Sequence, residues 1–153
     1  MTTTTAQATQ VYQLLIKAAP ERIWEAITNP EFTTKYFHGS YVDSSFEPGA
    51  PYNGYSTDRS QHWVDGEVLE ADPPRRLQHT WRSLYDPQAA AEPHSRVTWK
   101  IEPQQDGTCL LTVVHDQLED SPKTADSVSG RGWTTVISGL KTLLETGRPL
   151  VES

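Results

Sequence analysis

Residues 130–147 read GRGWTTVISGLKTLLETG, and this stretch decides the fold. Its large apolar side chains recur at helical spacing on one broad face: Trp133, Val136, Ile137, Leu140, Leu143 and Leu144. Gly147 stands where a left-handed C-cap ends a helix. Gly130 and Gly132 weaken the start, so we expect the helix to break or begin near them. A helix with such a long apolar stripe must bury it against another layer of structure.

The residues before this helix predict that layer to be a β-sheet. From residue 41 onward apolar and polar side chains alternate, which is typical of half-buried strands. Turn residues at 47–49, 72–74 and 106–107 separate the runs. We predict six strands joined by short connections, hence antiparallel, at residues 41–46, 51–56, 63–71, 76–85, 95–102 and 108–116.

The N-terminal part adds one strand and two helices. Residues 11–18 are β-branched and aromatic, as in a strand, and Pro20 suits the first turn of a helix. Asn29-Pro30 ends that helix and begins a second short one. The predicted class is therefore α+β, with one domain at residues 10–148, a disordered tail at 1–9 and a C-terminal tail at 149–153.

Composition excludes several functional classes. The 153 residues carry a net charge of −7, which disfavours binding to nucleic-acid phosphates. No apolar run is long enough to span a membrane, and residues 1–5 show no signal-peptide pattern. The single cysteine, Cys109, cannot form an internal disulfide, which fits a cytoplasmic location. We expect no metal ion and no cofactor.

Aromatic side chains point to a ligand cavity. Strand alternation places Leu77, His79 and Trp81 on the inner face of the sheet, and likewise His115 in the last strand. Aromatic walls with a few polar groups suit small-molecule recognition. The candidate ligand-binding residues are Tyr36, Phe37, Trp81, Trp99, Trp133, Ile137, His79 and His115. The two histidines are either hydrogen-bonded core residues or weak candidates for catalytic acid and base.

Several motifs resemble the START-like (SRPBCC) superfamily. Residues 19–31 (APERIWEAITNPE) resemble its helix-entry signature, and residues 66–77 (GEVLEADPPRRL) with Thr80-Trp81 resemble its mid-sheet signature. Residues 95–99, 111–115 and Gly132-Trp133 resemble the later strands and the closing helix. The similarity is greatest to the group resembling the C-terminal domain of the heat-shock-protein-90 ATPase activator, and it spans about residues 10–147.

This resemblance implies a helix-grip fold, in which a curved seven-stranded antiparallel sheet wraps around a long C-terminal helix. It also implies a hydrophobic cavity between the two, but it carries no shared catalytic motif. Three functions follow as alternatives: binding of a small hydrophobic or aromatic molecule, a cyclase- or hydrolase-like activity on a polyketide-like or aromatic substrate, and a co-chaperone-type interaction. A homodimer formed through an exposed sheet edge is a further option.

Overall fold

The computed structural model describes residues 8–151, so most of the predicted tail at residues 1–9 lies outside the described part. Within it, seven strands form one antiparallel sheet in the order β1-β7-β6-β5-β4-β3-β2. Their bounds are β1 Gln10–Ile16, β2 Tyr41–Asp43, β3 Pro51–Tyr55, β4 His62–Asp72, β5 Arg76–Ser83, β6 Ser95–Pro103 and β7 Cys109–Asp116. The predicted α+β class and helix-grip fold are confirmed.

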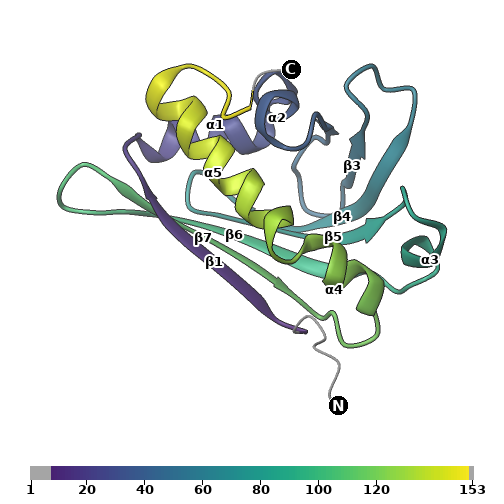
Figure 1. Cartoon of the computed structure of the whole chain (residues 1–153). Coiled ribbons are helices and arrows are strands. Elements are labelled where there is room, and N and C mark those ends of the chain that lie inside the picture. Colours follow the sequence, from purple (N-terminus) through teal and green to yellow (C-terminus); the bar gives the residue numbers. More distant parts are fainter. Residues whose placement is uncertain (1–7, 152–153) are drawn as a thin grey trace, which may run out of the picture.

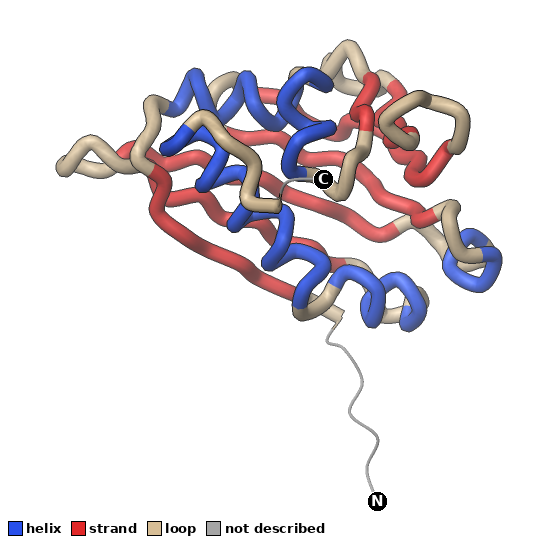
Figure 2. Tube along the Cα trace, turned by 45° about the horizontal axis from the view of Figure 1, so that its top comes forward, coloured by secondary structure: helices blue, strands red, loops and turns tan. Residues whose placement is uncertain are grey.

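Helices α1 (Pro20–Thr28), α2 (Pro30–Tyr36) and α5 (Arg131–Thr146) lie on one face of the sheet (Figures 1 and 2). Both proline-led helices after β1 begin where the sequence predicts. Asn29 ends α1 and caps α2, because its side-chain oxygen accepts a hydrogen bond of 2.9 Å from the Glu31 N–H. None of the helices in residues 8–151 is long and apolar enough to cross a membrane.

The C-terminal helix α5 is preceded by α4 (Pro122–Val128). The helical conformation is interrupted between them at Gly130, which has a φ of 58°. The break predicted near Gly130 and Gly132 is thus confirmed. Gly132 is required at its position, since a Cβ there would lie 2.9 Å from the Ser127 carbonyl oxygen. Helix α5 ends at Gly147, whose N–H donates to the Leu143 carbonyl at 2.9 Å.

Strands β1, β2 and β5 end two or three residues before their predicted ends, and β1 ends at Ile16 instead of residue 18. Strand β2 ends at Asp43, and Phe46 has a φ of 58°, which no regular strand residue adopts. Strand β5 ends at Ser83, and the loop that follows contains a short helix, α3 (Pro87–Ala90). Asp86 caps α3 by accepting a hydrogen bond of 2.9 Å from the Gln88 N–H.

The predicted inner face of the sheet is buried against α5. Leu77, His79 and Trp81 of β5 alternate with half-buried residues. Strands β6 and β7 follow the same alternation except at Thr98 and Thr112, outer-face residues that are only 5% exposed because Gln78 and Gln13 cover them. The outer face is polar and carries two side-chain pairs, Arg82 with Asp65 at 2.6 Å and Arg96 with Asp116 at 2.7 Å. Burial of each large apolar side chain of α5 contributes about 1.5–3 kcal/mol, so the helix is held mainly by this stripe.

Candidate ligand cavity

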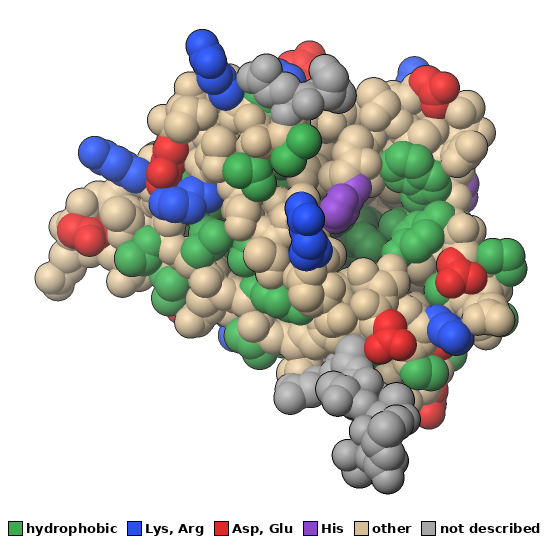
Figure 3. Space-filling view, in the orientation of Figure 1, with side chains coloured by type: hydrophobic (Ala, Val, Ile, Leu, Met, Phe, Trp, Pro, Cys, Tyr) green, Lys and Arg blue, Asp and Glu red, His purple; other side chains and the backbone are tan. Residues whose placement is uncertain are grey.

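A cavity of about 590 Å³ opens beside the start of α5. Figure 3 shows the corresponding hollow, with hydrophobic side chains inside it and a histidine and a basic side chain beside it. Its walls come from the end of α2, from β4 and β5, and from α4 and α5. The lining residues are Phe37, His38, Ser40, Trp63, Val64, Trp81, Tyr85, Ser127, Val128, Arg131, Gly132, Trp133, Thr135 and Val136.

The wall of the cavity is an aromatic cluster centred on Phe37. The Phe37 ring stacks on Trp81, with 6.0 Å between ring centroids and 18° between planes. It meets Trp133 edge-on, at 5.8 Å and 65°. These arrangements are the favoured ones for aromatic pairs, and they fix the orientation of the rings that face the cavity.

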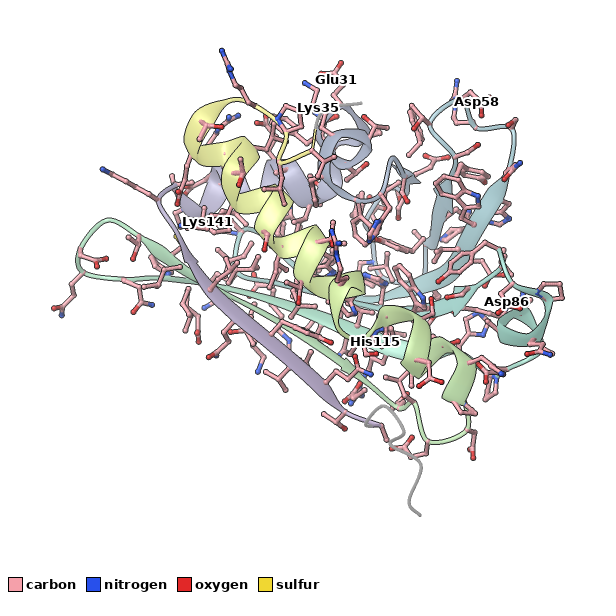
Figure 4. The ribbon with its side chains drawn as sticks, in the orientation of Figure 1. Glu31, Lys35, Asp58, Asp86, His115 and Lys141 are labelled. Carbon is pink, nitrogen blue, oxygen red and sulfur yellow. The ribbon has the colours of Figure 1, made fainter. Side chains whose placement is uncertain are left out.

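A hydrogen-bond chain behind this wall holds the Trp133 indole. Its Nε1–H donates to Nδ1 of His115 at 3.0 Å, and the other ring nitrogen of His115, Nε2, donates to the Ser95 hydroxyl at 2.7 Å. The Ser95 hydroxyl in turn donates to the Trp81 carbonyl at 3.2 Å. Figure 4 shows His115 close to the beginning of α5, between that helix and the sheet. Both ring nitrogens of His115 are therefore used.

His79 holds the Trp99 indole in the same way. Trp99 Nε1–H donates to His79 Nε2 at 3.1 Å, and His79 Nδ1–H donates to the Thr80 carbonyl at 3.0 Å. The Tyr52 ring stacks on the imidazole, with 3.7 Å between centroids. His79, like His115, is 0% exposed.

The electrostatics of both histidines favour the neutral ring. Burial lowers the pKa of His79 from 6.5 to about 4. Burial, with a smaller contribution from His79, lowers the pKa of His115 from 6.5 to about 3. Each neutral imidazole has one donor and one acceptor nitrogen, which is what its two hydrogen bonds require.

The structure brings together three of the eight predicted ligand-binding residues, because Phe37, Trp81 and Trp133 line the cavity. The other five lie elsewhere. Trp99, His79, His115 and Ile137 are buried behind the wall, and Tyr36 donates a hydrogen bond of 2.8 Å to the Ala26 carbonyl. Tyr36 also lines a second hollow of about 800 Å³ between α2, α5 and residues 149–151. The assignment of these eight residues to ligand binding stays a prediction.

Sequence reasoning missed the residues at the mouth of the cavity. His38 lies in the turn after α2 and Arg131 is the first residue of α5, and at neither place does a periodic pattern assign a face. His38 has a φ of 52°, and its Nε2–H donates to the Gly132 carbonyl at 3.2 Å, which joins the turn after α2 to the first turn of α5. The His38-Gly39 and Gly130-Arg131-Gly132 sequences mark turns, and that was the one available signal. The alternation pattern predicts Tyr85 within a strand, but Tyr85 follows the end of β5 at Ser83.

The described residues offer no place for metal or thiolate chemistry. No group of three His, Cys, Asp or Glu side chains within residues 8–151 is arranged to hold a metal ion. Cys109 is buried, and burial together with the nearby Glu21 raises the pKa of its thiol. A thiol with a raised pKa is a poor nucleophile at neutral pH.

Comparison with solved structures shows the same architecture. Protein MLL2253 from Mesorhizobium loti is 25% identical with a TM-score of 0.72, and the match covers 90% of this chain and 96% of that one. PFC0360w, an HSP90 activator from Plasmodium falciparum, is 17% identical with a TM-score of 0.70, covering 94% and 99%. The Aha1 dimer from Colwellia psychrerythraea is 15% identical with a TM-score of 0.71, covering 92% and 98%.

No curated protein matches this chain by sequence. A family model does match, and it does so over residues 17–145, from the end of β1 to the last turn of α5. That range includes the aromatic cavity and both buried histidines. The chain therefore belongs to the family of activator of Hsp90 ATPase homolog 1-like proteins.

Proposed function

We propose that this protein binds a small hydrophobic or aromatic molecule in the cavity beside the start of α5. The observation that carries the proposal is the aromatic wall of Phe37, Trp81 and Trp133 around a volume of about 590 Å³. About 300 Å² of apolar ligand surface buried there would contribute roughly 7 kcal/mol before the costs of association. Micromolar affinity is the expected range.

The first experiment is a titration with prodan, a neutral naphthalene dye whose emission shifts to the blue in apolar surroundings. We expect a blue shift that saturates at micromolar protein concentration. Val136 is 2% exposed and lines the cavity, so Val136→Phe should fill part of the space and weaken binding at least tenfold, about 1.4 kcal/mol.

The matched control is Val11→Phe, the same exchange at an edge-strand residue that is 57% exposed and outside this cavity. It should bind prodan as the unaltered protein does. Circular dichroism spectra establish that both variants fold. Equal binding by the folded Val136→Phe variant, or no binding by the unaltered protein, would contradict the proposal.

The geometry favours binding over a catalytic mechanism built on His79 and His115. Both rings are fully buried and both use their two nitrogens within the protein. A general acid or base must reach the substrate within hydrogen-bond distance, directly or through one water. A cyclase- or hydrolase-like activity would thus have to use the polar groups at the cavity mouth.

Activation of Hsp90 is a second candidate, and it rests on the family to which the chain belongs. The test is the ATPase rate of purified Hsp90 with and without an excess of this protein. A several-fold increase would support the role, and an unchanged rate would remove it. The Val136→Phe variant separates the two candidates, because a filled cavity should not affect an interaction made by the outer surface.

Two further properties belong to the proposal. A homodimer could form at β1, the sheet edge, where Val11 and Leu15 are 57% and 47% exposed. Light scattering during gel filtration tests this: Val11→Lys should convert a dimer to a monomer, whereas a monomeric unaltered protein would refute the dimer.

A cytoplasmic location fits the buried single cysteine, and fractionation of the source cells tests it.

A further inference from the structure

The deep part of the cavity offers no free indole N–H group to a ligand. Trp133 Nε1–H is used by His115, and Trp81 Nε1–H donates to the Ser83 hydroxyl at 3.0 Å. Trp63 Nε1–H donates to the Gln61 side chain at 3.2 Å. The tryptophans therefore present only ring surface, which suits a flat apolar or aromatic group.

The mouth of the cavity is different, because it carries one unpaired cation. Arg131 lines the cavity, is exposed, and makes no ion pair or side-chain hydrogen bond within residues 8–151. No carboxylate is present among the described residues that line the cavity. In a protein with a net charge of −7, an arginine without an acidic neighbour at a cavity mouth favours an anionic ligand.

The second unpaired polar group is the hydroxyl of Ser40, which follows the turn after α2. Ser40 is 8% exposed, it lines the cavity, and its hydroxyl has no hydrogen-bond partner among the described residues. Every fully buried side-chain polar atom in that part of the chain does have a partner. The Ser40 hydroxyl therefore keeps some exposed surface, and because Ser40 lines the cavity, a ligand atom there can accept its hydrogen bond.

A hydrogen bond holds the turn before Ser40 against the start of α5, next to Arg131. His38, two residues before Ser40, donates to the carbonyl of Gly132, the residue after Arg131, at 3.2 Å. The contact places the turn at the first turn of α5, where the helix dipole also favours negative charge. The lining of the cavity thus includes the two donor side chains of Arg131 and Ser40 as well as the aromatic wall.

We propose that the ligand is a flat aromatic carboxylate, with its ring against Phe37, Trp81 and Trp133 and its carboxylate at Arg131 and Ser40. The inference rests on the proposed function and specifies the chemistry of its ligand. A planar carboxylate matches the two-pronged guanidinium. One guanidinium compensates one negative charge, which suits a carboxylate better than a doubly charged phosphate.

The experiment compares two probes of the same shape by titration calorimetry, 2-naphthoate and the neutral 2-naphthamide. We expect 2-naphthoate to bind about tenfold more tightly at low salt, which corresponds to about 1.4 kcal/mol. Arg131→Gln should remove this preference, because it should weaken 2-naphthoate binding about tenfold more than it weakens 2-naphthamide binding. Ser40→Ala should reduce it in the same direction by a smaller factor.

Arg148→Gln is the matched control, since it removes the same charge from an exposed arginine that lies outside the cavity lining. It should keep the preference. Equal affinities for the two probes, or a preference that survives Arg131→Gln, would overturn the carboxylate inference while the proposed function stands. Binding of neither probe would count against the proposed function for two-ring ligands, and the inference would fall with it.

Discussion

The two histidines of the inner face act as acceptors for tryptophan. His79 receives the indole N–H of Trp99, and His115 receives that of Trp133. A buried indole needs an acceptor, because an unsatisfied polar group in the core costs about 1–3 kcal/mol. A neutral imidazole provides that acceptor and passes its own N–H to a carbonyl or a hydroxyl. A role as hydrogen-bonded core residues accounts for both ring nitrogens of His79 and of His115.

The lowered pKa values of His79 and His115 predict a loss of stability in mild acid. In the unfolded chain each histidine takes up a proton near pH 6.5, whereas in the folded protein it does so only near pH 4 and pH 3, respectively. Protons therefore bind the unfolded state preferentially as the pH falls below 6.5. Between pH 7 and pH 5 the free energy of unfolding should decrease by about 2 kcal/mol for each histidine.

Urea unfolding at the two pH values measures this difference. His115→Gln should reduce the pH-dependent loss by about half, whatever its own stability at pH 7. Val11→Phe is the control, because it changes an exposed side chain that does not titrate and should leave the loss unchanged. A free energy of unfolding that stays constant from pH 7 to pH 5 would show that the folded protein takes up these protons over the same pH range as the unfolded chain.

Trp99→Phe tests the role of His79 as an acceptor. The ring remains apolar, but His79 Nε2 loses its donor, so we expect a destabilisation of about 1–3 kcal/mol in urea unfolding at pH 7. Trp24→Phe is matched to it, since the Trp24 indole has no hydrogen bond within residues 8–151 and is only half-buried. Similar losses in both variants would mean that ring size, and not the hydrogen bond, sets the cost.

At the scale of elements, the pairing of β4 with β5 depends on one glycine. A Cβ on Gly66 would lie 2.1 Å from the Thr80 carbonyl oxygen, so an alanine can be accommodated only if β5 moves. Thr80 lies between His79 and Trp81, which means that this movement would reach both the buried network and the cavity wall. Backbone shifts of this kind cost about 1–3 kcal/mol or more.

Gly66→Ala should therefore lower the melting temperature and weaken prodan binding together. Gly54→Ala is the milder comparison in the neighbouring strand, where the atom nearest to the added Cβ would be the Val64 Cβ at 3.3 Å. We expect that variant to keep its binding. Unchanged stability of Gly66→Ala would indicate that the two strands are farther apart than the structure has them.

The predictability of each element follows from its physics. Alternation in β5, β6 and β7 and the stripe of α5 reflect burial against a single layer, so sequence alone assigns their inner faces. Turns determine where β2 and β5 end. The residues at the mouth of the cavity lie in the turn after α2 and at the first residue of α5. There, side chains such as His38 and Arg131 are positioned by backbone geometry and by contacts distant in sequence, which no periodic pattern encodes.

At the scale of the whole molecule, the cavity lies at the N-terminal end of α5, because the space between this helix and the sheet is filled by side chains elsewhere along the helix. Along most of its length α5 is packed against the sheet through residues that are at most 6% exposed, among them Ile137, Leu140 and Leu143. At its first turn the neighbours are Phe37, Trp81 and α4, and the space between them stays open. The five tryptophans therefore divide into wall, core and surface roles.

Because three tryptophans line the cavity and Trp24 does not, the indole N–H groups can report whether a ligand binds there. The decisive measurement is a two-dimensional ¹H–¹⁵N NMR titration that follows the indole N–H signals while 2-acetonaphthone, a neutral two-ring ketone, is added. Binding in the cavity should produce saturable shifts of the Trp63, Trp81 and Trp133 signals and leave the Trp24 signal unmoved, since Trp24 lies outside the cavity. Shifts confined to Trp24, or no saturable shift in any of them, would contradict it.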